Sequence, residues 1–418
     1  MTNTLSARDE EAALEELHRL GCTDGLPVVI PTAERVNRMV LASGLEADMM
    51  LGTMGPGHGI ATVEKVAIAA VMAGCLPDYM PVVIAAVKAV IDPEFDLTEM
   101  QATTHCTAPL IIVNGPARHT CGPIASGTGA LGPGHRANAT IGRALRLTMI
   151  NIGKARPGSS DMALLGHPGK FTFCLAEDEE NSPFTPLHVS RGFDAGDSVV
   201  TVLGSEAPHS VIYAGDGDDP NSYKSLLELL AMGLANPPSN NGTLTGGCAT
   251  VVLNPEHSAI LHGAGLTRED IAQELYQRSF VEASIVKRLF SQFAGPDPQD
   301  RMAFKGPEQI LILQAGGSGV YSMVMPSWCV GAHANSAVSV KVEADMFCEI
   351  ELSKSCVLEA LTALDEKRDK EEIAKLASLA LQHCLAARIA LILAQDSSSD
   401  SSQLAHYQSG CVETDNCA

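Results

Sequence analysis

Apolar and polar positions repeat along the chain with two periods, one typical of helices and one typical of buried strands. Helical stripes cover residues 9–20 and begin again after Thr32, Thr62 and Asp78. Short continuous apolar runs predict strands at 109–113, 170–175, 198–203, 249–253 and 310–313. Because the runs alternate with helical stretches, we expect an α/β fold with mostly parallel sheets flanked by helices.

One unit occurs twice in this pattern. Leu110 to Gly115 and Val251 to His257 both give a buried strand, a terminal Asn, a Pro and then a His before a helix. This pseudo-repeat predicts two related lobes. The expected divisions are an N-terminal lobe at 1–195, a second lobe at 196–350, C-terminal helices at 351–395 and a disordered, cysteine-containing tail at 396–418.

The stretch from 109 to 143 is the first candidate site, because a strand, a glycine-rich loop and a helix follow one another. Glycine lets the backbone approach a ligand, and a helix N-terminus favours an anionic group. A second glycine run, at 316–319, follows the last predicted strand. The substrate-binding candidates are Asn114, Gly127, Gly129, Gly132, His135, Arg136, Asn138, Gly317 and Ser318.

The glycine loop also matches G-x-G-x-x-G, but its position argues against a dinucleotide site. Such a fingerprint follows its strand directly, whereas Gly127 lies fourteen residues beyond Val113. A structural loop or an anion cradle is the better interpretation.

Polar residues at the ends of the predicted strands suggest where catalysis would take place. If the strands are parallel, their carboxyl ends meet at one edge of the sheet, where open α/β sheets bind ligands. His119, Glu256 and His257 would then gather there, with His209 beside them.

Charge and composition narrow the function classes. The chain has 28 basic and 49 acidic side chains, a net charge of −21, which argues against nucleic-acid and anionic membrane partners. The first sixteen residues show no signal peptide, and the apolar stretch 81–91 is too short to span a bilayer. We therefore expect a cytoplasmic protein, and its apolar content suggests a homo-oligomer acting on a small-molecule substrate.

Twelve cysteines occur without any C-x-x-C pair, so no cofactor or zinc ribbon is predicted. Cys106, beside His105, and Cys121, near His119, bracket the central strand. A neighbouring imidazolium lowers the pKa of a thiol, so His105, His119 or His257 could activate one of these cysteines. Because adjacent residues of a strand point to opposite faces, the partner of Cys106 could instead be His58 or His135. Alternatively each cysteine is a small buried hydrophobe.

Two further roles for sulfur and imidazole remain open. A transition metal such as zinc could be bound by His58, His105 and His135, or by the histidines and cysteines around the strand. Cys411 and Cys417 in the tail could form a redox tail that delivers electrons to a core thiol, or could have no function.

Several motifs resemble a bacterial family of largely uncharacterised proteins, the UGSC-type (seleno)proteins. They are Thr23 to Val29, the run Leu131 to Leu147, Asn254 to His257 and the glycines at 316–319. The similarity covers most of residues 10–345 and implies thiol or selenol chemistry on a small molecule. The chain has no Cys-Gly-Ser-Cys sequence, so no residue of that motif is carried over.

The leading hypothesis is a cysteine-dependent enzyme acting on a small anionic molecule by thiol redox, lyase or transfer chemistry at the interface of the two lobes. Cys106 or Cys121 would be the reactive thiol, helped by His105, His119, Glu256 or His257, and the 127–136 loop would hold the anionic group. The alternatives are a metal-dependent hydrolase or lyase, and a soft-metal or ligand-binding protein.

Overall fold

The computed structural model describes residues 5–215, 219–343, 375 and 378. The chain up to Val342 forms one compact unit, and the residues from Glu343 onward form a second. The helices expected at 351–395, apart from Lys375 and Ser378, and the tail expected at 396–418 lie outside the described residues.

The N-terminal helices form where the apolar stripes predict them. Thr32 and Thr62 cap two of these helices by accepting the backbone N–H groups of Arg35 and Lys65. Gly44, in the left-handed region, ends the first of the two. The helices are α1 (Glu10–Arg19), α2 (Ala33–Ser43), α3 (Val63–Ala73), α4 (Met80–Ile91) and, after the glycine-rich loop, α7 (Arg136–Asn151).

The first large sheet has four strands, in the order β12 (Val338–Lys341), β5 (Val199–Ser205), β3 (Ala108–Asn114) and β4 (Cys174–Ala176). β3 is parallel to β4 and antiparallel to β5. The second large sheet has the order β10 (Ile310–Gln314), β7 (Ala249–Leu253), β11 (Tyr321–Met325) and β6 (His209–Ile212). β7 is parallel to β10 and antiparallel to β11.

These directions give mixed sheets and correct the expectation of mostly parallel ones. β5 was expected to be parallel because it is one continuous apolar run, and all seven of its residues are buried. That burial comes from helix α4 on one face and the second sheet on the other. An antiparallel strand covered on both faces therefore has the sequence that usually marks a parallel strand.

The two sheets exchange their outer strands. β6 follows β5 along the chain but pairs with β11, whereas β12 follows β11 and pairs with β5. The two crossovers touch where Glu206 N donates to Pro326 O at 2.9 Å. Neither half of the chain holds a complete sheet, and the two related lobes expected around residue 195 are not confirmed.

The inner faces of the sheets pack against each other. Alternate residues of each strand point into this layer, as the two-residue period of a strand requires. The layer is almost fully buried and includes Leu110, Ile112, Leu175, Leu203, Val252, Leu311, Leu313 and Met325.

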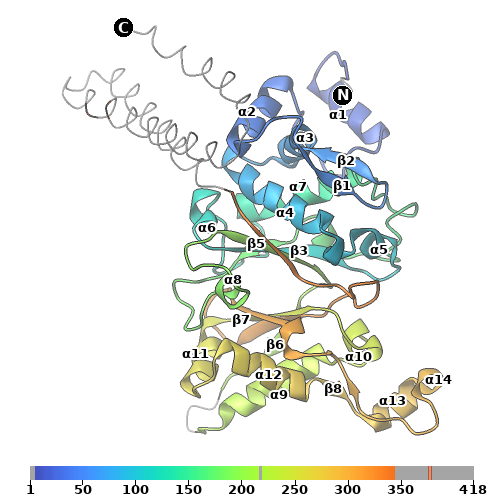
Figure 1. The fold of residues 1–418 in the computed structure, drawn as a ribbon, viewed down its shortest axis with the longest axis vertical. Helices are drawn as coiled ribbons and strands as arrows, with labels where there is room; N and C mark the ends of the chain where they lie inside the picture. The colour runs from blue at the N-terminus through green and yellow to red at the C-terminus, as the bar shows by residue number, and fades with distance from the viewer. Residues whose placement is uncertain (1–4, 216–218, 344–374, 376–377, 379–418) are drawn as a thin grey trace, which may run out of the picture. The chain divides into compact units, whose positions relative to one another are not determined.

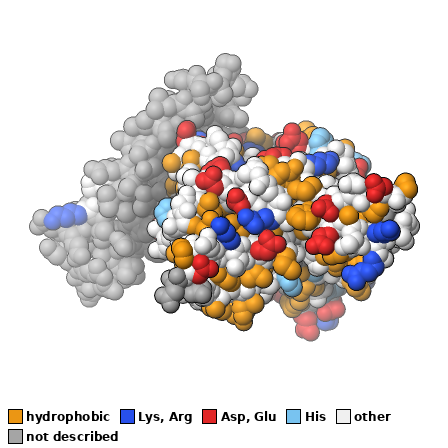
Figure 2. Space-filling view, turned by 90° about the horizontal axis from the view of Figure 1, so that it is seen from below, with side chains coloured by type: hydrophobic (Ala, Val, Ile, Leu, Met, Phe, Trp, Pro, Cys, Tyr) orange, Lys and Arg blue, Asp and Glu red, His pale blue; other side chains and the backbone are white. Residues whose placement is uncertain are grey.

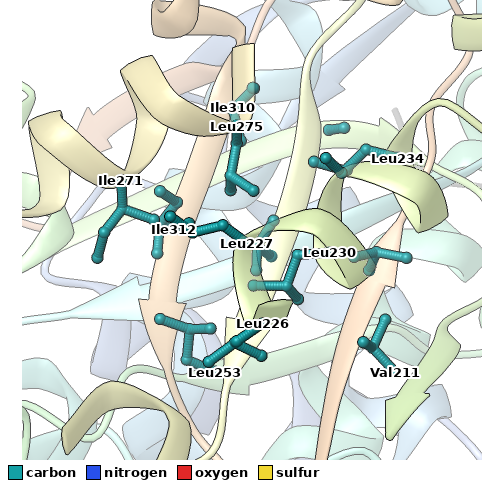
Figure 3. Close-up of a cluster of buried hydrophobic side chains, with 14 of the residues drawn as sticks. Val211, Leu226, Leu227, Leu230, Leu234, Leu253, Ile271, Leu275, Ile310 and Ile312 are labelled. Atoms are coloured by element: carbon teal, nitrogen blue, oxygen red, sulfur yellow. The ribbon is translucent and has the colours of Figure 1, made fainter. Parts of the chain in front are cut away.

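Helices cover the two outer faces, so the unit has four layers (Figure 1). α4 contacts β5 and β12 on the first sheet, while α9 (Ser222–Leu234) and α12 (Arg268–Arg278) pack on the second. Figure 3 shows the leucines of α9 reaching the strands of the second sheet. That core contains Leu226, Leu227, Leu230, Leu234, Leu253, Ile310 and Ile312.

In the view from below, Figure 2 shows acidic and basic side chains interspersed with hydrophobic ones. Among the described residues, no helix combines the length and the apolar character needed to cross a membrane.

The remaining helices and strands are short. They are β1 (Met50–Met54), β2 (Gly59–Thr62), α5 (Leu97–Ala102), α6 (Ala117–Thr120), α8 (Leu187–Ser190), α10 (Asn240–Leu244), α11 (Pro255–Gly263), β8 (Phe280–Val281), α13 (Ala283–Leu289), α14 (Ser291–Ala294) and β9 (Arg301–Met302).

Leu313→Ala tests the layer between the sheets. The Leu313 side chain is fully buried there, so its loss should lower the free energy of unfolding by about 2–5 kcal/mol. Leu165→Ala, at a side chain that is 96% exposed, should change it by less than about 0.5 kcal/mol. Urea unfolding measures both, and equal effects in the two variants would contradict the sandwich.

Candidate functional site

The antiparallel direction of β5 brings a histidine and a glutamate together at the start of β3. Ala108, the first residue of β3, pairs with Ser205, the last residue of β5. His105 and Glu206, which flank that pair, meet with His105 Nε2 2.8 Å from Glu206 Oε1. Their side chains are 17% and 22% exposed. Both side chains are therefore mostly buried and keep partial contact with solvent.

The second ring nitrogen of His105 is placed differently. His105 Nδ1 is buried and has no hydrogen-bond partner among the described residues. A histidine held through one nitrogen by a carboxylate, with the other nitrogen unengaged, has the arrangement of a general acid or base.

Cys106, next in the chain, is half-buried beside this pair. Burial raises the pKa of the Cys106 thiol, the Glu206 carboxylate raises it further, and Lys170 partly opposes both. The sequence-based hypothesis was that an imidazolium lowers this pKa. The shift has the opposite sign because burial, reinforced by the Glu206 carboxylate, disfavours the thiolate.

Lys170 is held near Cys106 by buried polar contacts. Its Nζ donates to Asp161 Oδ1 at 3.0 Å and to the Thr107 carbonyl oxygen at 3.2 Å. Asp161 also accepts from Arg146 at 2.6 Å. Burial opposes ionisation of Asp161, but Arg146 and Lys170 outweigh it and hold the Asp161 pKa below its ordinary range. Burial lowers the pKa of Lys170.

His167 and Cys329 also lie close enough to Glu206 to interact with its charge. His167 Nε2 is 3.2 Å from the Ser205 carbonyl oxygen, and burial lowers the pKa of His167. Burial and the Glu206 carboxylate raise the pKa of Cys329 to about 12. We call His105, Cys106, His167, Lys170 and Glu206 the His105 cluster.

Sequence reasoning found two members of this cluster, His105 and Cys106. It missed Glu206 because the direction of β5 was unknown, and it missed His167 and Lys170 because they precede β4, whereas candidates were sought at the carboxyl ends of strands. Glu206 follows an apolar run, which was the available signal, but a parallel β5 would have placed it at the opposite end of β3.

A second polar network lies at the carboxyl end of β3. Asn114 Nδ2 donates to Glu177 at 2.6 Å and to Glu179 at 2.8 Å. Glu177, fully buried, also accepts from Arg268 at 2.6 Å. Arg118 joins Glu179 at 3.1 Å. Asn114, predicted to bind substrate, is thus a buried link between ion pairs.

Cys121 and His119 lie near this network and far from the His105 cluster. The six residue steps of β3, at about 3.3 Å each, separate the two ends by roughly 20 Å. Cys121 directly follows α6 and is fully buried. His119 is exposed, and its Nε2 lies 3.2 Å from Glu180 Oε1. Hydrogen bonding to Arg118 lowers the pKa of Glu180 to about 2. The structure does not bring Cys106 and Cys121 into one site.

The glycine-rich loop is held beside β4 by Asn138, a predicted binding residue. The buried Asn138 amide bonds both backbone groups of Ala125 and the Ala130 carbonyl oxygen. The loop residues Gly127, Gly129 and Gly132 are exposed. This loop meets the carboxyl end of β4, where Ala176 N donates to Ala125 O, and is therefore remote from Cys106.

The other predicted binding residues lie apart from the His105 cluster, and most of them make structural contacts. His135 is the residue before α7, and its side chain does not cap that helix. Arg136 donates to the Gly74 carbonyl oxygen. Gly317 packs closely on Thr128, which joins the two glycine loops. Ser318 hydrogen-bonds the carboxylate of Glu256.

Glu256 bonds the loop after β10, and His257 bonds strand β11 and the residue after β6. His257 uses both ring nitrogens, at 2.6 Å from Ser322 Oγ and 2.9 Å from the Tyr213 carbonyl oxygen. Glu256 accepts from Gly319 N at 2.8 Å, which lowers its pKa. These contacts favour a structural role over the predicted catalytic one.

The alternative metal ligands are not gathered. His58 is exposed in the β1–β2 turn, His105 pairs with Glu206, and His135 lies before α7. Within the described ranges, no three His, Cys, Asp or Glu side chains are arranged to hold a metal ion. Cys411 and Cys417, the proposed redox tail, lie outside the described residues.

Comparison with known proteins gives no assignment: no family model, no curated protein and no solved structure matches the chain. The resemblance to the UGSC-type group stays a prediction from its motifs. One of these motifs is anchored to α7, because Arg143 Nε donates to Asp24 at 2.8 Å and a second guanidinium nitrogen donates to Pro27 O at 2.8 Å.

Arg268→Met tests the buried network at the carboxyl end of β3. Removing the cation leaves the buried Glu177 carboxylate without its ion-pair partner, so the free energy of unfolding should fall by about 3–5 kcal/mol. The double variant E177Q/R268M should recover much of that loss. Arg278 is 31% exposed in its ion pair with Glu274, so R278M should lower the free energy of unfolding by at most about 1 kcal/mol. Equal losses in R268M and R278M, by urea unfolding, would refute the assignment.

Glu206→Gln tests the electrostatics of Cys106. Because the Glu206 carboxylate raises the pKa of the thiol, its removal should shift the pH profile of alkylation to lower pH. Iodoacetamide labelling of Cys106 at pH 8 should therefore be faster in E206Q than in the unmodified protein, because more of the thiol is ionised. Peptide mass spectrometry follows Cys106, with Cys22 as the half-exposed internal reference. An unchanged or opposite shift would place Glu206 outside the field of the thiol.

Proposed function

We propose that this protein is a thiol-dependent enzyme that acts on a small organic molecule at the His105 cluster, by a lyase or transfer reaction. The observation that carries the proposal is the pair of His105 and Glu206. One imidazole nitrogen is 2.8 Å from the carboxylate, the other is unengaged, and a half-buried thiol follows in the chain.

The raised pKa of Cys106 determines how such an enzyme would work. A neutral thiol must lose its proton as it attacks, and His105 is the base that takes it. Glu206 then stabilises the imidazolium and holds its orientation. The ammonium group of Lys170 is available to stabilise negative charge that develops on the substrate.

The site differs from the one first expected. The hypothesis combined Cys106 with an anion held by the 127–136 loop, but that loop lies at the other end of β3. Lys170 replaces it as a cation whose charge acts on the thiol. The resemblance to the UGSC-type group agrees with thiol chemistry, and a cytoplasmic homo-oligomer remains the expected form of the enzyme.

Covalent trapping tests the function. The full-length protein is incubated with small α,β-unsaturated acids and ketones, and adducts and turnover are followed by peptide mass spectrometry. Adducts should form on Cys106 and disappear in C106S. H105Q should slow their formation on the order of 100-fold, the usual size of a lost general base.

C22S is the matched control, because Cys22 is also half-exposed and lies outside the cluster. It should leave the reaction at Cys106 unchanged. Adducts shared equally between Cys106 and Cys22, or full reactivity in H105Q, would rule out a base-assisted thiol.

A further inference from the structure

An unusually exposed set of apolar side chains lies beside the His105 cluster. Leu164 is 79% exposed and Leu165 is 96% exposed, and both belong to the long connection between α7 and β4. Connections of this length are commonly binding loops or lids. We call Met162, Leu164, Leu165 and Phe171, all at least 40% exposed, the apolar lip.

Two contacts fix the lip next to Cys106. Leu164 N donates to Thr104 O at 3.0 Å, which places this leucine two residues from the thiol on the neighbouring segment. Gly166, directly after Leu165, packs on the side chain of Lys170. The backbone at Leu164 and Leu165 is therefore held between Thr104, two residues from Cys106, and Lys170, whose charge acts on the thiol.

The anchoring of the loop makes the exposure of these leucines informative. Asp161 is buried and held by Arg146 and Lys170, and Met162 N donates to Gln101 O at 3.0 Å. The backbone is thus fixed while the apolar side chains remain in water. Such a surface, on a segment that is bonded to the one that carries Cys106, favours a ligand that contacts both.

We propose that the apolar lip is the specificity element of the His105 cluster, so that the substrate carries an apolar chain or ring beside its reacting polar end. This inference rests on the proposed function, since it assigns the reacting end to Cys106. The carbon chain would lie along Leu164 and Leu165 and exclude water from the thiol as it binds.

A series of N-alkylmaleimides tests the proposal, because only the length of the alkyl chain changes. The Cys106 sulfur adds to the maleimide double bond and a proton goes to the adjacent carbon, so the reaction needs no further reagent. Labelling of the full-length protein with methyl, propyl and hexyl maleimide is followed at Cys106 and Cys22. The rate at Cys106 should rise with chain length, by up to about fourfold per methylene group that is buried.

The double variant L164S/L165S should reduce the chain-length dependence at Cys106 to that at Cys22. The rate with methyl maleimide is the reference from which the chain-length dependence of each variant is measured. L41S, at a side chain 70% exposed on α2, is the matched control and should retain the wild-type dependence.

The outcomes separate the two proposals. If labelling of Cys106 depends on His105 but not on chain length, the role of the apolar lip is wrong and the proposed thiol-dependent function stands. Labelling of Cys106 that is indifferent to His105 would overturn the enzyme. A wild-type dimer that L164S/L165S converts to a monomer, by light scattering, would show that the lip is an interface between copies and overturn this assignment.

Discussion

Pairing between β3 and β5 determines where the two clusters of polar side chains lie, one at each end of β3. Seven residue pairs fix the register, from Ala108 with Ser205 to Asn114 with Val199. A slip of one residue would turn Leu203 out of the layer between the sheets, so packing of that layer holds the register. The contact between His105 and Glu206, 101 residues apart in sequence, depends on the same packing.

The two ends of β3 carry polar groups in contrasting environments. At the carboxyl end Glu177 is fully buried and accepts hydrogen bonds from Asn114 and Arg268, an arrangement costly to break and suited to specifying the fold. At the other end His105 and Cys106 are half-buried. The buried ion pair of Glu177 with Arg268 favours stability, whereas the partly exposed side chains of His105 and Cys106 leave the other end open to a ligand.

Exchange of the outer strands gives the His105 cluster a rigid frame. Glu206 lies on the crossover from β5 to β6, and the other crossover holds it through Pro326. The Asn335 amide bonds both backbone groups of Gly204, at 2.7 and 2.8 Å, just before this point. A carboxylate on a restrained crossover can orient an imidazole more precisely than one on a free loop.

The sequence by itself determined the local elements. Caps and stripes gave α2, α3 and α7, and apolar runs located β3, β7 and β10, because these signals depend on neighbours along the chain. It also singled out His105 and Cys106. It missed β6 and β11, where exposed residues interrupt the apolar pattern. Tertiary structure decided the direction of β5, the strand exchange and the meeting of His105 with Glu206, since burial on both faces makes strands of either direction equally apolar and only long-range packing distinguishes them.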